Sequence, residues 1–434
     1  MVDLADVPAW ITYHPRRHAA VRTHEYIYAQ LIPYIGNKRR LLPLIARGIA
    51  ATACHGGLFV DLFTGSTVVA RLAKTLGFRV AANDWEPYSY EIARGTVANN
   101  HPPAFASLGG VEAVFHHLNA LPPLHGYIAT HLCPADDERP DPRHERLFFT
   151  RQNGERIDAI REQIAAWEAA GALTEAERAY LLSALVYAVS YVSNTSGVFK
   201  GFHEGWGGQT GTALYRIRSV LRVRPPVLYD NGAENLALRA DAQQLARELP
   251  TILGREPDIV YLDPPYNQHP YGSNYHVLNT VVLWDKPAIT ARFAPGRRDK
   301  SAIRTDWRVE RRSPYNSSRT ALPAFAELIN ALSARWILLS YSTDGTMPVE
   351  AVLQIMAERG SVRVLTHRYR RYRVSTPRKS PRPYTVEFLV ILDTRGRSSR
   401  GRVDQLVEQI LREEGRSHGD VSPAGDFEFS YAAG

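Results

Sequence analysis

The sequence predicts an α/β fold built on an open sheet, with a largely helical insertion. Short apolar runs at residues 58–60, 78–82 and 259–262 each stop at or next to an aspartate, and turn residues follow. Such runs are typical of buried strands whose ends open into loops. Proline and histidine then cluster between residues 101 and 146, and helical patterns continue to residue 192. This break in the α/β pattern indicates the insertion.

Length and composition are those of a soluble globular enzyme of two or three domains, or of one large domain with an insertion. The chain has 434 residues, 44% of them hydrophobic and 22% charged, with a formal charge of +8. The basic surplus fits a polyanion partner. Two cysteines, Cys54 and Cys133, exclude a disulfide framework and a structural zinc set, and no ligand cluster predicts a metal. With no signal peptide and no apolar run long enough to span a bilayer, we expect a cytoplasmic protein.

Residues 1–30 are rich in histidine and arginine and show no period, so we expect an extension with little structure of its own. A helix is predicted next, from a stripe formed by Leu41, Leu44, Ile45 and Ile49. Lys38 stands at its start, which the helix dipole disfavours for a cation. Either Lys38 is a solvated side chain, or Tyr34, Gly36 and Lys38 line a pocket in which the glycine lets a ligand approach the backbone.

The run at residues 58–60 leads into an acidic, glycine-containing loop from Asp61 to Gly65, and Ser66 or Thr67 is expected to cap the next helix. The loop lacks the glycines that bind a pyrophosphate, and the Asp61 carboxylate favours a ligand with positive or donor groups. The next strand ends at Asn83 and Asp84, where an acid is placed to bind ribose hydroxyls. Each acid alone could be a cap or a turn residue, but two successive strands that end this way favour a pocket.

The stretch IVYLDPPY, residues 259–266, predicts a buried strand that stops at a proline pair. Proline fixes φ and removes an N–H, so the carbonyls of Asp263 and Pro264 are held rigid and unpaired. At the carboxyl end of a strand such groups face the ligand crevice. A carboxylate, rigid carbonyls and the Tyr266 ring together suit a flat base with an amino group. The alternative is a strand followed by an ordinary tight turn.

Four motifs in this order, YIGNK, FVDLFTG, NDWE and DPPY, resemble those of the DNA adenine methylase family, the alpha-group N6-adenine DNA methyltransferases. The resemblance covers most of residues 31–395. It implies a Rossmann-like S-adenosylmethionine-dependent methyltransferase sheet with a largely helical inserted target-recognition region. Thr67 stands where many members carry a second glycine, which leaves the loop geometry open. The resemblance assigns the cofactor site to Tyr34, Gly36, Lys38, Asp61, Phe63, Gly65, Asp84 and, from its place upstream of the catalytic strand, Asp241.

The resemblance also divides the chain. Residues 1–30 would be an N-terminal extension and residues 31–100 the cofactor-binding half of the methyltransferase domain. Residues 101–225 would be the inserted target-recognition region, in which Thr174 and Glu177 predict a capping box. The α/β pattern resumes at Val227 to Asn231. The catalytic half would span residues 226–395, and residues 396–434 a peripheral, partly disordered tail.

Two stretches are candidates for DNA contact. The glycine-rich loop from Asn194 to Gly211 carries Lys200 and His203 among aromatic residues, and such loops can insert against bases. Residues 367–382 contain no acid, and four arginines interleave there with tyrosines: Arg368, Arg370, Arg371 and Arg373. This suits phosphate contact with stacking. The alternatives are a plain connector and a solvated charge run.

Together these observations predict a site-specific DNA methyltransferase that modifies the N6 amine of a flipped adenine in duplex DNA, with Asp263, Pro264, Pro265 and Tyr266 as the catalytic motif. We expect a monomer in a restriction-modification or related system, with a cognate endonuclease as a possible partner and no membrane. The alternatives are a methyltransferase of RNA adenine or protein glutamine, and a non-catalytic DNA-binding relative. The interpretation fails if the catalytic turn lies far from the acidic loop, or if its carboxylate is buried in a structural ion pair.

Overall fold

The fold is known from a computed structural model that describes residues 19–208, 211–268, 270–289, 293–294, 297–298, 301–304, 307, 311–370, 384–399 and 401–415. Its centre is a seven-stranded sheet in the order β3-β2-β1-β4-β7-β9-β8. Strands β1 to β4 and β7 run parallel, and β9 is antiparallel to both β7 and β8. The predicted Rossmann-like α/β fold is confirmed. The strands are β1 (Gly57–Asp61), β2 (Phe78–Asn83), β3 (Leu236–Leu238), β4 (Ile259–Leu262), β7 (Trp336–Ser342), β8 (Ser361–Arg370) and β9 (Tyr384–Asp393).

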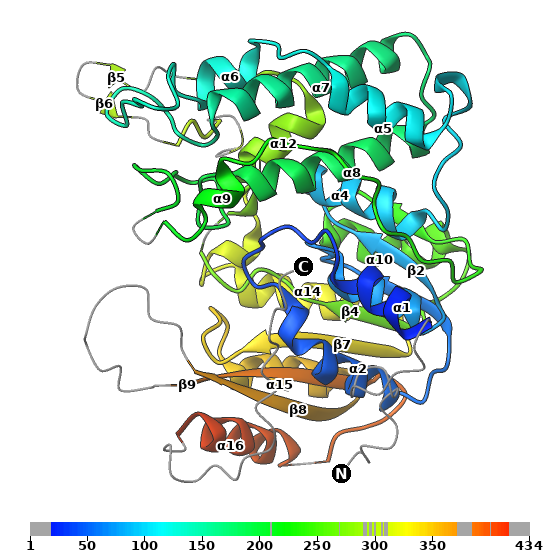
Figure 1. The fold of residues 1–434 in the computed structure, drawn as a ribbon. Coiled ribbons are helices and arrows are strands. Elements are labelled where there is room, and N and C mark those ends of the chain that lie inside the picture. The colour runs from blue at the N-terminus through cyan, green and yellow to red at the C-terminus, as the bar shows by residue number, and fades with distance from the viewer. Residues whose placement is uncertain are drawn as a thin grey trace.

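Helices cover both faces of this sheet (Figure 1). Because side chains alternate along a strand, Leu58 and Val60 pack on one face of β1 and Phe59 on the other. The Phe59 face is covered by α1 (Ala19–Tyr28), α2 (Leu42–Ala50) and α3 (Val68–Thr75). The opposite face is covered by α10 (Ala242–Leu253), α14 (Ala321–Ala331), α15 (Val349–Arg359) and α16 (Arg402–Gly415).

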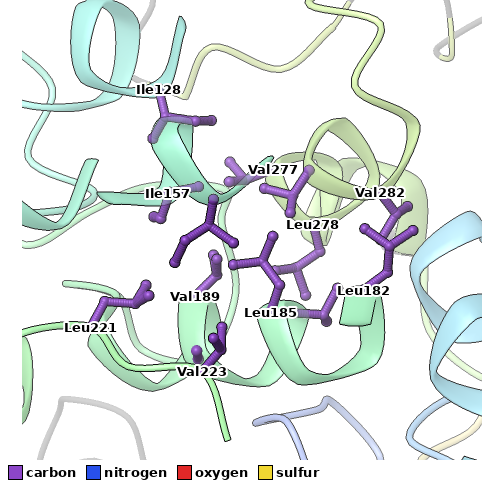
Figure 2. Packing of buried hydrophobic residues seen from close by; sticks show 14 of the residues in the cluster. Ile128, Ile157, Leu182, Leu185, Val189, Leu221, Val223, Val277, Leu278 and Val282 are labelled. Carbon is purple, nitrogen blue, oxygen red and sulfur yellow. The ribbon is translucent and has the colours of Figure 1, made fainter. Parts of the chain in front are cut away.

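A layer of helices forms the upper half of the molecule in Figure 1. We call it the helical layer; it contains α4 (Pro87–Ala93), α5 (Val111–Ala120), α6 (Tyr127–Leu132), α7 (Arg151–Ala169), α8 (Glu175–Val192), α9 (Leu214–Ile217), α11 (Tyr271–Asn274) and α12 (His276–Leu283). Although α12 follows the DPPY motif in sequence, its Val277, Leu278 and Val282 pack among residues of α7 and α8 (Figure 2). The helical layer therefore combines α4, helices of residues 101–225 and helices that follow β4.

The remaining elements are short. They are the one-turn helices η2 (Lys38–Leu41), η3 (Arg94–Ala98), η4 (Ala106–Leu108) and η5 (Pro314–Asn316), and the strands β5 (Phe293–Ala294) and β6 (Arg297–Arg298), which form a separate pair. Among the described residues, no helix combines the length and apolar character needed to cross a membrane.

Several local predictions are confirmed. The stripe of Leu41, Leu44, Ile45 and Ile49 is buried, as expected for the core-facing side of a helix. The capping box at the start of α8 forms in both directions, with the Thr174 hydroxyl accepting from Glu177 N and the Glu177 carboxylate accepting from Thr174 N.

Four local predictions are wrong. Residues 19–28, expected to have little structure, form α1, whose Tyr26 and Ile27 are fully buried. Residues 402–415, expected in a peripheral tail, form α16, which buries Leu406 and Ile410 against the sheet. No strand forms at residues 227–231; the edge strand is β3, further along the chain. Neither Ser66 nor Thr67 caps α3 with its side chain.

Candidate active site

The carboxyl ends of β1, β2 and β4 meet at one edge of the sheet, and a pocket opens there. At β1 the chain turns from one half of the sheet to the other, since β2 lies on one side and β4 on the other; ligands bind at such a switch point in open α/β sheets. Six of the predicted site residues line this pocket: Tyr34, Phe63, Asp84, Asp241, Asp263 and Pro265. The others are not among its lining residues: Gly36, Lys38, Asp61, Gly65, Pro264 and Tyr266.

Asp84 holds the acidic loop in place. Its carboxylate accepts hydrogen bonds from the backbone of Gly65 and Glu86, both at 2.9 Å, and from the Ser89 hydroxyl at 3.0 Å. A Cβ atom on Gly65 would lie 2.7 Å from the Tyr34 ring. The loop backbone therefore packs directly against an aromatic face, which only glycine allows.

Thr67, which stands where many family members carry a second glycine, adopts the backbone conformation typical of glycine. Its φ of 68° lies in the left-handed region that glycine adopts readily. Its hydroxyl accepts a hydrogen bond of 3.0 Å from Nε of Arg71, which is buried and also donates to the carbonyls at the end of α1. Thr67 thus replaces a glycine with a strained residue that Arg71 supports.

Asp61 is a buried carboxylate with one unpartnered oxygen. Its Oδ2 accepts from the Thr64 hydroxyl at 3.0 Å, whereas Oδ1 has no partner in hydrogen-bonding geometry among the described residues. Burial raises the pKa of Asp61 to about 8, against the opposing effects of the Thr64 hydroxyl and the Ala70 backbone N–H. Such a group gains from any ligand that brings a donor or a positive charge.

Asp263 forms an ion pair with Lys38, in which Nζ and Oδ1 are 3.0 Å apart. The same Nζ donates to the Tyr266 hydroxyl at 2.7 Å and lies 4.0 Å from Oε2 of Glu387 on β9. Burial alone would lower the pKa of Lys38, but Asp263, Tyr266 and Glu387 hold it well above its usual value. The Lys38 side chain is 3% exposed, so the interpretation as a solvated lysine is wrong.

Two arrangements of the DPPY turn would have ruled out its predicted role: a position far from the acidic loop, or a carboxylate buried in a structural ion pair. The turn lies beside the acidic loop, because β1 pairs with β4 and Asp61 is level with Tyr261. The carboxylate does form an ion pair, but Asp263 retains 17% exposure and lines the pocket. The pair therefore leaves the carboxylate within reach of a ligand, and it is not sealed into the core.

Further aromatic residues complete the pocket and were missed from the sequence. Tyr271 lines it and donates to the Ile35 carbonyl at 3.1 Å, and Tyr34 stacks on Tyr275 with ring centroids 5.1 Å apart. Tyr315 stands edge-on to Phe63 at 5.8 Å. Tyr271 follows Tyr266 by five residues, so its place just after the DPPY motif could have suggested it, but nothing local marks Tyr315.

Glu86 is a further pocket residue that the sequence did not single out. Burial raises its pKa to about 7, and its carboxylate accepts a hydrogen bond of 2.6 Å from Asn279 of α12. It therefore joins the carboxyl edge of the sheet to the helical layer.

The predicted DNA-contacting residues lie in two places. In the glycine-rich loop, Phe199 and Phe202 are buried, so the expectation that these aromatics are free to insert against bases is wrong. His203 and Lys200 are partly exposed, and Nε2 of His203 lies 3.3 Å from the Ser196 hydroxyl.

On β8 the Arg368 guanidinium stacks on Tyr384 at 4.2 Å, and β8 ends at Arg370. The side chain of Arg370, together with Arg371 and Arg373, lies outside the described residues. Within the part of the chain that the structure describes, no group of three or more histidine, cysteine, aspartate or glutamate side chains could hold a metal ion.

Comparison with known proteins gives consistent matches. The sequence model of the D12 class N6 adenine-specific DNA methyltransferases matches residues 34–306. The chain is 32% identical over 366 residues to the type II methyltransferase M.NlaIII of Neisseria lactamica, covering 83% of this chain and 98% of that protein. It is 31% identical over 369 residues to the modification methylase StsI of Streptococcus sanguinis, covering 82% of this chain and 51% of that protein. The match to M.FokI of Planomicrobium okeanokoites is 31% over 348 residues, 78% of this chain and 49% of the relative, so the chain spans about half the length of these last two proteins.

Proposed function

The chain belongs to the D12 class N6 adenine-specific DNA methyltransferase family, and from this premise we propose that it methylates the N6 amine of an adenine turned out of duplex DNA at a specific sequence. Because two of its relatives are named type II methyltransferases, we place it in a restriction-modification system with a cognate endonuclease. The proposal includes S-adenosylmethionine as methyl donor, a monomeric enzyme and a cytoplasmic location.

One observation carries the proposal: Asp263, at the end of β4, lines the same pocket as the cofactor-motif residues Tyr34 and Asp84. An adenine amine is a poor nucleophile, because its lone pair is delocalised into the ring. Two acceptors aimed at its N–H bonds favour the pyramidal nitrogen that can attack, and the Asp263 carboxylate and the Pro264 carbonyl supply them. Removing one such preorganised contact typically costs about 2.7–4 kcal/mol of transition-state stabilisation.

The pocket fits S-adenosylmethionine by the chemistry of its donors and acceptors. The unpartnered oxygen of Asp61 suits an ammonium group, and Tyr34, whose ring packs against Gly65, lines the pocket. Asp84 lines the pocket with its carboxylate held by Gly65, Glu86 and Ser89, and we assign the ribose hydroxyls of the cofactor to it. When bound, the cofactor supplies a methyl group already activated on a sulfonium.

Phe63 and Tyr315, which contact each other edge to face, line the pocket next to Asp241, and we assign the adenine ring of the cofactor to this side of the pocket. Oδ1 of Asp241 accepts from the backbone N–H groups of Gln243 and Gln244, which caps α10 and fixes the carboxylate at the pocket. We assign Asp241 to the exocyclic amine of the cofactor adenine on this basis.

The chain's own residues then position the target base. Tyr266 would stack on an adenine that leaves the duplex at a cost of a few kcal/mol. When the nitrogen takes the methyl group and the methyl–sulfur bond of the donor breaks, one N6 proton would leave, transiently to Asp263 or directly to water. We assign phosphate and base contacts to Lys200, Arg368, Arg370, Arg371 and Arg373, whose positive charge suits the DNA backbone, and to His203 in the same loop as Lys200.

Expression in a host without N6-adenine methylation tests the proposal. Sequencing of genomic DNA with modified-base detection should show N6-methyladenine at one recurring sequence for the wild-type chain, and none for Asp263→Ala. Modification of RNA or of a protein glutamine in place of DNA would support the alternative substrates. Tight DNA binding without any methyl transfer would instead indicate a non-catalytic relative.

A further inference from the structure

We propose that Lys38 and Glu387 are positioning residues for methyl transfer: the Lys38 ammonium orients the Asp263 carboxylate, and Glu387 offsets its positive charge. The inference rests on the proposed function of Asp263 and adds to it a buried carboxylate from a distant strand.

Lys38 contacts two residues of the DPPY motif. Its Nζ lies 3.0 Å from Oδ1 of Asp263, donates to the Tyr266 hydroxyl at 2.7 Å and lies 4.7 Å from the centre of the Tyr266 ring. One buried cation therefore contacts both the carboxylate that accepts from the amine and the ring that stacks on the base. Fixing Oδ1 on the protein side orients the carboxylate plane before the base arrives, and such preorganisation accelerates reactions.

Glu387 is a second carboxylate near the Lys38 ammonium. It lies on β9 opposite Ser342, and its Oε2 is 4.0 Å from Nζ of Lys38. This oxygen is buried and has no hydrogen-bond partner among the described residues, and the side chain is 14% exposed. A buried carboxylate is costly unless it is paired, and Lys38 is the cation within ion-pair distance of it.

The charges of the three groups explain why two carboxylates share one cation. An ammonium 3.0 Å from Asp263 would, on its own, offset the negative charge with which this carboxylate attracts the N–H groups of the base amine. Glu387 competes for the same ammonium, so with both carboxylates ionised Asp263, Lys38 and Glu387 carry a net charge of −1. A residual negative charge beside the pocket favours contact with amine hydrogens and with a positively charged methyl donor.

A double-mutant cycle tests this arrangement. Glu387→Gln keeps the volume and removes the charge, and Lys38→Met removes the ammonium. With tritiated S-adenosylmethionine and plasmid DNA from a host without adenine methylation, we expect single-turnover transfer to fall about tenfold in Glu387→Gln and about a hundredfold in Lys38→Met. Cofactor and DNA affinities should stay within about twofold in Glu387→Gln. Because Glu387 acts through Lys38, the double variant should be no slower than Lys38→Met alone.

The control is Glu413→Gln on α16, which removes a carboxylate that accepts from Thr366 of β8 at 2.7 Å and should leave transfer unchanged. Unchanged transfer in Glu387→Gln, strictly additive losses in the double variant, or an equal loss of cofactor affinity would each overturn the inference. If Lys38→Met fails to fold, Glu387→Gln alone decides, with its melting temperature as the check on folding. A wild-type chain that transfers no methyl would instead refute the proposed function itself.

Discussion

Two buried aspartates, one in the helical layer and one at the carboxyl edge of the sheet, differ in how fully their oxygens are used. Asp158 on α7 is fully buried and accepts hydrogen bonds from the backbone N–H groups of Gly126, Ile128 and Ala129 at 2.8–3.1 Å, at the start of α6. Asp61 is 1% exposed and accepts one hydrogen bond, from Thr64.

The difference distinguishes a carboxylate whose oxygens are used within the fold from one that keeps an unpartnered oxygen, to which we assign part of the cofactor. Burial raises the pKa of both, to about 6 for Asp158 and about 8 for Asp61. Three backbone donors oppose the rise at Asp158 and tie α6 to α7. At Asp61 an acceptor remains unfilled beside the pocket, which is costly in the absence of a ligand and useful in its presence.

Asp263 lines the pocket and is the carboxylate to which we assign the target amine, so its loss should have the largest effect. In Asp263→Ala we expect methyl transfer to fall by about 10²–10³-fold or more, because an acceptor for the amine is lost. Cofactor affinity should stay within a few-fold of the wild type. Calorimetry and a tritiated-methyl assay measure the two quantities. An equal loss of both would show that Asp263 serves cofactor binding and not the transfer step.

Asp158 represents the structural class, and Asp158→Asn should destabilise the chain. An amide keeps one acceptor oxygen but turns an NH₂ group towards backbone donors, so we expect a loss of about 2–3 kcal/mol in the free energy of unfolding. Urea denaturation measures it, and cofactor affinity of the folded variant should be unchanged. An Asp158→Asn protein with wild-type stability would erase the distinction between the two aspartates.

Asp61→Asn should have the opposite effects, with lower cofactor affinity and unreduced stability. We expect about a tenfold loss of cofactor affinity, since a charge-assisted contact contributes roughly 1.5–3 kcal/mol. The stability of the cofactor-free protein should not fall, because an uncompensated buried carboxyl is removed. Calorimetric titration and thermal unfolding on the same sample compare the two effects. Lower stability with intact cofactor affinity would place Asp61 in the structural class.

Because the pKa of Asp61 is raised, both the free energy of unfolding and the cofactor affinity should depend on pH. The folded group titrates at about 8 and the unfolded group at about 3.9, so between these values the folded state alone holds the proton. The contribution of Asp61 to the free energy of unfolding therefore falls as the pH rises through this window. Cofactor affinity should rise towards pH 8, because the ligand favours the ionised form. Both slopes should be absent in Asp61→Asn, measured at pH 6 to 8.

Thr67→Gly should have the smallest effect. Glycine relieves a left-handed conformation that costs about 1–2 kcal/mol, but it loses the hydrogen bond from Arg71 and adds freedom to the unfolded chain. The net change in the free energy of unfolding should lie within about 1 kcal/mol. Thr67→Ala, which keeps the strain and loses the bond, is the matched control and should be the less stable of the two in urea.

Features that depend on neighbours in sequence were predictable. The strands that end at Asp61, Asp84 and Asp263 follow from apolar runs, and the sheet brings their ends together because parallel strands share an edge. The unfavourable place of Lys38 in its helix also marked it for a role. Its partner Glu387 could not be found this way, because β9 comes next to the pocket only through the order of strands in the sheet.

The missed elements have physical reasons too. Tyr315 reaches the pocket by tertiary packing against Phe63, which no local pattern encodes. The helix at residues 19–28 lies in a segment rich in histidine and arginine, and its Tyr26 and Ile27 are buried because α3 and the core on that side of the sheet supply a surface for them.

The place of α12 limits how this enzyme can be re-engineered. Val277, Leu278 and Val282 follow the catalytic motif in sequence, yet they belong to the packed interior of the helical layer. A chimera that exchanges only residues 101–225 for those of a relative would set foreign side chains against these three and leave voids or clashes. An exchange that keeps this packed interior intact therefore requires transplanting α12 with residues 101–225, as one discontinuous unit.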